Sequence, residues 1–214
     1  RMIEELIKYK LDNYLLFDSN YLFESCDLMR VFGGAIRDSI CGDKISDVDI
    51  LVGSDSIHLL EGFLTSIGWK YMDNLQPKDL SSIYTDIRVI NEPHTWMNGD
   101  RIIQLIRPSI NNTSHRRRYR GEKIDEYYIQ GFNELISNVD ISCCGVSWDG
   151  KVLFEDFKGS ISHCQNKVYS INKNAKMYSE KRILHRLSKF DKRGWREIEV
   201  GTNINRDLKL NILL

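Results

Sequence analysis

Residues 31–52 read VFGGAIRDSICGDKISDVDILV, and the rest of the chain is organised around this stretch. It predicts a strand that ends at Gly33-Gly34, a short helix over 35–40 and a second strand over 47–52. Adjacent glycines permit a left-handed backbone and let another group approach the main chain closely. A helix that begins after such a turn presents free N–H groups to an anion. The first half of the stretch therefore predicts a phosphate-binding turn.

The second half of the stretch carries two carboxylates, Asp47 and Asp49. They are two residues apart in the predicted strand, so they lie on one face, roughly 7 Å apart along it. Neighbouring carboxylates repel each other unless a cation lies between them, and oxygen-rich sites suit Mg²⁺ shared with substrate phosphates. A phosphate cradle beside a metal site is the combination that metal-assisted nucleotidyl transfer requires. The alternative is a tight turn followed by an exposed acidic strand end.

The segment 33–38, Gly-Gly-Ala-Ile-Arg-Asp, followed by Asp47-Val48-Asp49, resembles the signature of the DNA polymerase β-type nucleotidyltransferase superfamily. Within that superfamily it is most similar to the head domain of tRNA CCA-adding enzymes and bacterial poly(A) polymerases. The resemblance covers roughly residues 28–195. The body and tail domains of the family have no counterpart in the sequence, so we expect a minimal form of the head.

The resemblance implies that a nucleoside triphosphate binds with Mg²⁺ (or Mn²⁺) across this stretch. The implied nucleotide-binding residues are Gly33, Gly34, Arg37 and Arg107. For Arg37 the alternative is an ion pair with Asp38, and for Arg107 it is a surface salt bridge.

Asp47 and Asp49 are the implied catalytic and metal-binding carboxylates, and the superfamily requires a third on a neighbouring strand. The matching strand, 101–106, contains no acid, and Gln104 is its only uncharged polar residue. Asp140 matches the aspartate of a family segment that begins Arg-Arg-Asp, although the paired arginines are absent here. We expect Asp140 to complete the catalytic metal site, because an unpaired buried carboxylate would be costly. The alternative is that Asp140 contacts the ribose hydroxyl.

Basic residues form two candidate surfaces for an acceptor's phosphates. One is the segment 109–121, and the other is the basic helix 179–192, whose Arg182 matches the leading arginine of a family helix; the candidate acceptor-binding residues are Arg116, Arg117, Arg118, Arg120 and Arg182. The alternative for both is a solvated surface. Three functions compete: transfer of a nucleotide to an RNA 3′ end, with tRNA as one candidate, transfer to a protein or small molecule, and non-catalytic nucleotide binding.

Composition is that of an ordinary soluble globular protein, with 214 residues, 42% hydrophobic and 28% charged. The formal net charge is zero, so nucleic-acid binding must come from local patches. No apolar run is long enough to span a membrane and no signal peptide is evident, so we expect no membrane partner. Five cysteines without Cys-x-x-Cys spacing favour a reducing, cytoplasmic location. The oligomeric state stays open.

Periodicity predicts an α+β protein with a mixed β-sheet, helices packed on one side and a C-terminal helical extension. The expected division is an N-terminal helical segment 1–27, a head domain 28–175 and a C-terminal segment 176–214. Predicted helices cover 2–12, 55–67, 122–136, 157–166 and 179–192. Predicted strands cover 69–72, 87–90, 101–107, 139–148, 151–154 and 168–171.

Overall fold

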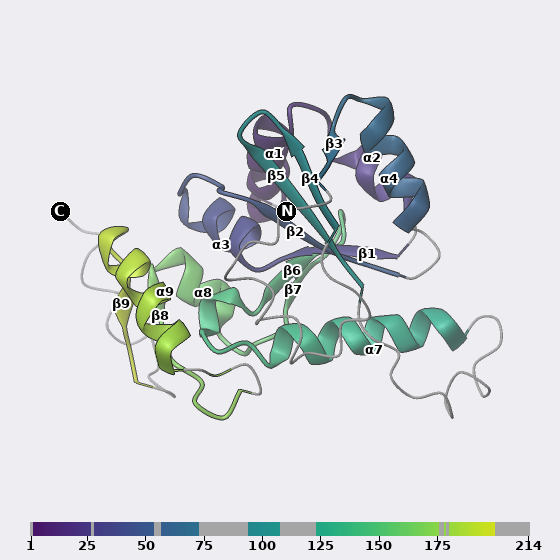
Figure 1. Cartoon of the computed structure of the whole chain (residues 1–214). Helices are drawn as coiled ribbons and strands as arrows, with labels where there is room; N and C mark the ends of the chain where they lie inside the picture. The colour runs from purple at the N-terminus through teal and green to yellow at the C-terminus, as the bar shows by residue number, and fades with distance from the viewer. Residues whose placement is uncertain are drawn as a thin grey trace.

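The computed structural model describes residues 2–26, 28–53, 57–72, 94–107, 123–175, 178 and 180–199, with the backbone alone at 123–127. Within these residues seven strands form one mixed sheet in the order β3-β4-β5-β2-β1-β6-β7 (Figure 1). Their bounds are β1 Met29–Phe32, β2 Val48–Val52, β3 Lys70–Tyr71, β4 His94–Asn98, β5 Arg101–Ile106, β6 Val146–Trp148 and β7 Leu153–Glu155. The pairing of β2 with β5 is parallel and the other pairings are antiparallel. The α+β class with a mixed sheet is confirmed.

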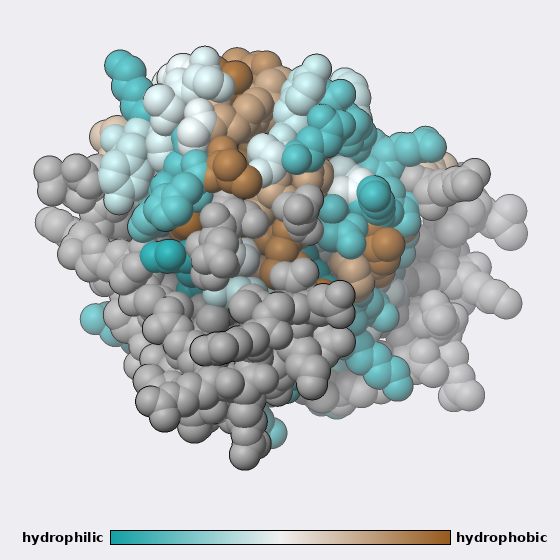
Figure 2. Space-filling view, turned by 90° about the vertical axis from the view of Figure 1, so that its right-hand side faces the viewer, coloured by the Kyte–Doolittle hydropathy of each residue, from teal (hydrophilic) through white to brown (hydrophobic). Residues whose placement is uncertain are grey.

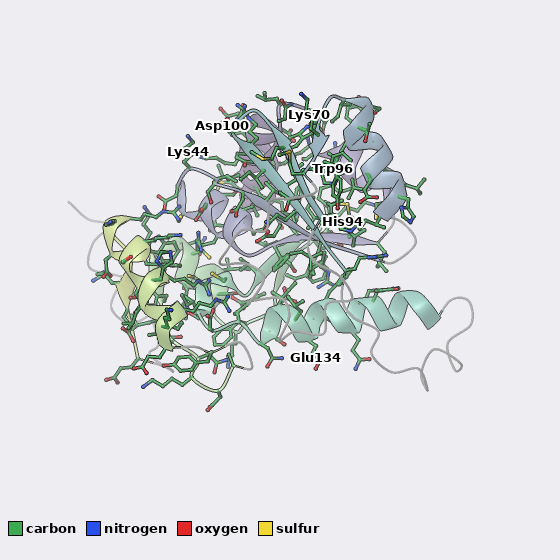
Figure 3. The ribbon with its side chains drawn as sticks, in the orientation of Figure 1. Lys44, Lys70, His94, Trp96, Asp100 and Glu134 are labelled. Atoms are coloured by element: carbon green, nitrogen blue, oxygen red, sulfur yellow. The ribbon has the colours of Figure 1, made fainter. Side chains whose placement is uncertain are left out.

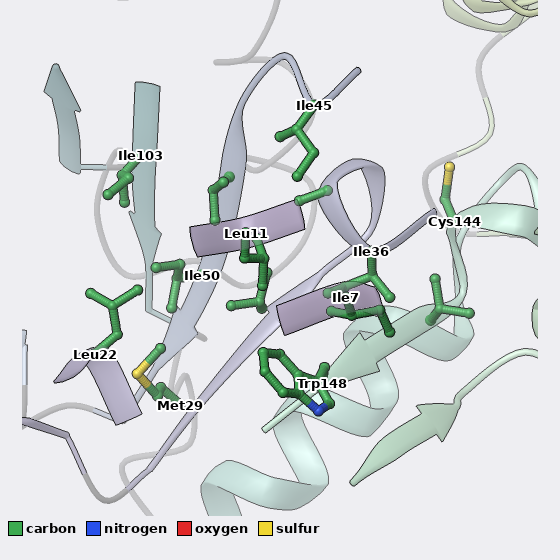
Figure 4. Close-up of a cluster of buried hydrophobic side chains, with 14 of the residues drawn as sticks. Ile7, Leu11, Leu22, Met29, Ile36, Ile45, Ile50, Ile103, Cys144 and Trp148 are labelled. Atoms are coloured by element: carbon green, nitrogen blue, oxygen red, sulfur yellow. The ribbon is translucent and has the colours of Figure 1, made fainter. Parts of the chain in front are cut away.

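Helices cover both faces of this sheet rather than one side (Figure 1). The larger cluster joins one face to α1 (Met2–Leu15), α2 (Asn20–Ser25), α3 (Gly34–Cys41) and α4 (Ile57–Ser66). Figure 4 shows the centre of this cluster, which contains Leu11 and Ile36 of the helices together with Ile50 of β2 and Trp148 of β6. The opposite face is covered by α7 (Lys123–Ser137).

The α7 face has its own cluster, in which Phe32, Leu51 and Ile106 of the strands pack against Phe132 and Ile136 of the helix. A strand covered on both faces reads as a nearly continuous apolar run, which explains the sequence of β2. Because side chains alternate along a strand, Leu51 shares its face with the residues two and four positions earlier. Asp49 therefore lies on the α7 face, and Asp47 directly precedes β2.

The predicted long strand over 139–148 is wrong in its first half. Residues Ser142–Cys144 form a 3₁₀ turn, and β6 begins only at Val146. The Ser142 hydroxyl accepts a hydrogen bond from the Ser170 backbone N–H at 2.9 Å, and Phe157 packs so tightly on Gly145 that a Cβ there would lie 2.2 Å from its own Cβ. These contacts join residues distant in sequence, so a local apolar pattern does not reveal them.

After the sheet the chain forms α8 (Ser160–Gln165), β8 (Val168–Tyr169), α9 (Glu180–Lys192) and β9 (Arg196–Glu197). β8 and β9 pair in parallel as a small second sheet. Phe190 of α9 and Trp195 enter the larger core cluster, as do Ile7 and Leu11 of α1. Both flanking segments thus share a core with the sheet, and the division at 27 and 175 stays a prediction.

The side of the molecule that carries α2 and α4 has an apolar strip bordered by hydrophilic side chains (Figure 2). On this side His94 of β4 contacts Glu61 of α4 at 2.5 Å, and Trp96 lies farther along the same strand (Figure 3). None of the described helices is long and apolar enough to cross a membrane. The predicted strand 87–90 and the basic segment 109–121 lie outside the described residues.

Candidate active site

A row of side chains crosses the α7 face of the sheet at the level of Asp49. Asp49 of β2 is paired with Gln104 of β5 on one side and with Phe32 of β1 on the other. Adjacent strands lie about 4.8 Å apart, so these side chains are immediate neighbours. We call the set the Asp49 row; its members from β4 to β6 are Thr95, Gln104, Asp49, Phe32 and Ser147.

The glycine turn lies beside this row because it directly follows Phe32. Gly33 has φ +66°, a left-handed conformation that favours glycine, and its N–H donates to the Val146 carbonyl at 3.0 Å. Apart from the two chain neighbours, no heavy atom of the described residues lies within 4 Å of the position that a Cβ would take there. The first N–H groups of α3, which begins at Gly34, have no acceptor within the helix, as at any helix start. A helix start of this kind is a place that anions favour, and here it lies next to the Asp49 row.

The Asp47 end of the site is held by Tyr14, a residue of α1 that the sequence did not single out. Its hydroxyl donates to the Ser46 carbonyl at 2.8 Å and accepts from the Ile102 N–H at 2.8 Å. The Ser46 hydroxyl in turn donates to Asp47 Oδ1 at 2.9 Å. Tyr14 thus joins the chain before β2 to the start of β5. Burial, with a smaller contribution from the charge of Asp47, raises the pKa of Tyr14, which keeps its hydroxyl protonated.

Arg37 makes the ion pair with Asp38 that we considered as its alternative role, and its nucleotide-binding role stays a prediction. It is buried, and its Nε donates to Asp38 Oδ1 at 2.7 Å. Its guanidinium lies 4.9 Å from the Phe190 ring centroid and 5.8 Å from that of Trp195. Its Nη2 still lies near the glycine turn, 3.7 Å from the position of a Cβ on Gly34. Arg37 therefore supports the turn from behind and keeps one nitrogen close to it.

Asp140 has arginine partners. Its carboxylate is 1% exposed, Arg186 Nη1 donates to it, and Arg182 Nη2 lies 3.9 Å away. The expected cost of an unpaired buried carboxylate is thus offset by guanidinium groups from α9. The metal role of Asp140 stays a prediction. Arg182, the candidate acceptor-binding residue of this helix, is 19% exposed in its side chain.

The thiol of Cys144 connects Asp140 to the glycine turn. Arg186 Nη2 and Arg37 Nη1 donate to its Sγ at 3.2 and 3.4 Å. A hydrogen bond from Cys143, together with these two guanidinium groups, lowers the pKa of Cys144 to about 5, which favours the thiolate. We call this set the arginine–thiolate network; its members are Asp140, Arg186, Cys144, Arg37 and Asp38.

A second acidic group adjoins the network. Ligand atoms of Asp38, Cys41 and Asp43 lie within 4.8 Å of one another. Arg193 Nη2 lies 2.9 Å from Asp38 and 3.2 Å from Asp43, and Lys167 Nζ lies 2.7 Å from Asp43. Burial raises the pKa of Cys41 to about 11, which disfavours the thiolate that a metal needs. These carboxylates are paired with protein cations, and we do not assign a metal to them.

Among the remaining sequence candidates, Arg107 lies away from the Asp49 row. Arg107 follows β5, three residues beyond Gln104, which places it about 10 Å along the strand from the level of Asp49. It lies at the end of β5 away from the level of Asp47, and its nucleotide-binding role stays a prediction. Arg116, Arg117, Arg118 and Arg120 lie outside the described residues.

Comparison with known proteins finds similarity in structure alone. No protein-family model matches the sequence, and no curated protein sequence matches it. An apo CCA-adding enzyme superposes with a TM-score of 0.63 at 15% identity, over 92% of this chain and 42% of the enzyme chain. The chain has the fold of the matched part of the CCA-adding enzymes.

Two liganded structures give the same result. A CCA-adding enzyme with CTP has a TM-score of 0.59 at 14% identity, over 92% of this chain and 43% of that one. The Thermotoga maritima CCA-adding enzyme complexed with tRNA has a TM-score of 0.58 at 16% identity, over 92% and 42%. The chain thus spans less than half the length of the enzymes it resembles.

Proposed function

We propose that the chain is a metal-dependent nucleotidyltransferase that moves a nucleoside monophosphate from a nucleoside triphosphate to an RNA 3′ hydroxyl. The observation that carries the proposal is the position of the Gly33 turn beside the Asp49 row. An open cradle for phosphate and an oxygen-rich site for a cation share one end of the sheet, on the fold of enzymes that have been solved with CTP, ATP and tRNA.

The residues of the site suit a divalent cation. Asp49 of β2 and Asp47, two residues before it, offer carboxylate oxygens, and hard cations such as Mg²⁺ and Mn²⁺ prefer oxygen ligands. A bound divalent cation would neutralise triphosphate charge and lower the pKa of the attacking hydroxyl.

The protein's own contribution is to position the reactants. The N–H groups at the start of α3 hold the β- and γ-phosphates, and Arg37 adds positive charge behind Gly34. Tyr14 and Ser46 fix Asp47, and the β2 ladder fixes Asp49. Groups held in this way align the attacking hydroxyl with the α-phosphate. Such positioning, together with electrostatic stabilisation, accounts for most of the rate enhancement in phosphoryl transfer.

The activity is tested by incubating the protein with each labelled nucleoside triphosphate, Mg²⁺ or Mn²⁺, and total RNA. We expect label at RNA 3′ ends with at least one of the four nucleotides. Label on protein or on a small molecule would replace the acceptor class. Binding of nucleotide without any transfer would reduce the chain to a nucleotide-binding module.

The acceptor contact is tested through salt dependence. Replacing Arg116, Arg117, Arg118 and Arg120 together by alanine should weaken RNA binding and flatten the dependence of log affinity on log salt, because fewer counterions are released. Filter binding between about 50 and 200 mM salt measures this slope. An unchanged slope favours a solvated segment without RNA contacts.

A further inference from the structure

Gln104 is a buried amide whose oxygen accepts no hydrogen bond from the described part of the protein. Its side chain is 2% exposed, and its Oε1 has no hydrogen-bond partner among the described residues. Leaving such an acceptor buried without a partner costs about 1–3 kcal/mol. Buried polar atoms of this kind call for an explanation, and a bound ion is one of the ordinary ones.

The position of Gln104 indicates that its oxygen binds a cation. It is paired with Asp49 across the parallel β2–β5 ladder, so both side chains leave the same face of adjacent strands. An amide oxygen beside a carboxylate repels it, unless a cation accepts electron pairs from both. Carbonyl oxygens of glutamine belong to the usual ligand set of Mg²⁺, Mn²⁺ and Ca²⁺.

Asp140, the acid predicted as third ligand, is paired with arginines. Asp140 is ion-paired with Arg186 and approached by Arg182, both from α9. Gln104, in contrast, lies one strand from Asp49 and carries a neutral oxygen. The side-chain amide can turn by 180° about its last bond, so either end can be presented without moving the backbone.

We propose that Gln104 supplies a neutral amide-oxygen ligand to the cation held by Asp47 and Asp49. The inference rests on the proposed function, because it deepens the same site. Two carboxylates and one amide carry one negative charge less than three carboxylates. The cation is therefore held more weakly and exchanges more readily than at a site with three acids.

The experiment measures Mn²⁺ binding to the full chain without nucleotide, by the electron paramagnetic resonance signal of unbound Mn²⁺. Gln104→Leu keeps the approximate volume and removes the oxygen, and Gln104→Glu adds the missing charge. We expect the first to weaken and the second to tighten Mn²⁺ binding, each about tenfold. Thr95→Val is the matched control, because it removes a buried hydroxyl from the next position of the Asp49 row.

The outcomes separate this inference from the proposed function. Wild-type Mn²⁺ affinity in both Gln104 variants, with loss of binding in Asp49→Asn, overturns the role of Gln104 and leaves the carboxylate site in place. Wild-type affinity in Asp49→Asn overturns the metal site itself. Thermal unfolding of each variant verifies that it is folded, and the leucine and glutamate substitutions change binding in opposite directions, which misfolding does not imitate.

Discussion

The arginine–thiolate network and the Asp49 row both adjoin the β1–α3 turn, and they differ in how their buried polar groups are paired. In the network each buried anion has a cation from the protein: Asp140 has Arg186, Cys144 has Arg37 and Arg186, and Asp38 has Arg193. In the Asp49 row the Gln104 oxygen lacks a hydrogen-bond partner among the described residues. Asp38 Oδ2 and Asp140 Oδ2 of the network also lack a hydrogen bond within the described part of the chain, but each lies near an arginine of the protein, so the network supports the fold. The Gln104 oxygen is the acceptor to which we assign a bound cation.

The distinction between the two regions is wrong if substitutions in both have the same effect on transfer rate and stability. Asp49→Asn or Asp47→Asn should lower the rate of nucleotide transfer by 10²–10³ or more, because each removes a charge that the proposed cation needs. Stability should change little or rise, since two repelling carboxylates become one. Single-turnover transfer and urea unfolding measure the two effects.

Asp100→Asn is the matched control for these variants, because Asp100 is 86% exposed in its side chain at the turn before β5. It should leave both the rate and the stability near wild type. Near-normal transfer by a folded Asp49→Asn protein would remove the Asp49 row from the mechanism.

Arg186→Ala tests whether the network supports the stability of the fold and not metal binding. It leaves the buried Asp140 carboxylate and the Cys144 thiolate with fewer cationic partners, which should destabilise the fold by roughly 3 kcal/mol. Urea unfolding measures the change, and Mn²⁺ binding should stay unaltered in the folded protein. Lys189→Ala, an exposed residue of the same helix, is the control. Loss of Mn²⁺ binding without loss of stability would instead support the predicted metal role of Asp140.

The sequence predicted the two regions unequally, and the reason is physical. Gly33, Gly34, Asp47 and Asp49 lie within one stretch, where glycine geometry and the two-residue strand period are local properties. Their placement at one end of β1 and β2 was therefore predictable. Local patterns also recovered α1, α3, α4, α7 and α9.

The network depends on contacts that no local pattern contains. Arg186 reaches Asp140 across 46 residues, and Arg37 reaches Cys144 across 107. The role of Tyr14 was equally unpredictable from local sequence, because its hydroxyl bridges Ser46 and Ile102 from a helix at the start of the chain. The parallel β2–β5 pairing, which brings Gln104 to Asp49, is likewise a matter of topology rather than of spacing.

The pH dependence of stability sharpens the assignment of Cys144 as a charged member of the network. Its pKa is about 5 when folded and near the ordinary 9.0 when unfolded. Its contribution is therefore complete above about pH 9, declines as the pH falls toward 5, and is absent below that. One proton corresponds to at most about 1.4 kcal/mol per pH unit.

Urea unfolding between about pH 7 and 8.5 measures this slope in a range above the ordinary pKa of histidine. Stability of the wild type should rise with pH, and the slope should decrease in Cys144→Ser. Cys26→Ser removes a buried thiol outside the network and should keep the wild-type slope. Equal slopes in wild type and Cys144→Ser would make Cys144 a neutral thiol.

Tyr14→Phe should produce the smallest effect, because it removes one hydroxyl and leaves the ring in place. The Ile102 N–H and the Ser46 carbonyl each lose a hydrogen bond, which should cost about 1 kcal/mol of stability. The same loss frees the segment before β2, so Asp47 is held less firmly and transfer should slow several-fold, in line with the sensitivity of catalysis to small displacements. Tyr9→Phe, on the same helix but 64% exposed, is the control and should change neither quantity.

If Tyr14→Phe lowers stability and leaves the transfer rate untouched, Tyr14 belongs with the network as a support of the fold. If the rate falls together with Mn²⁺ affinity while Tyr9→Phe is silent, the helix at the start of the chain is part of the machinery that positions Asp47.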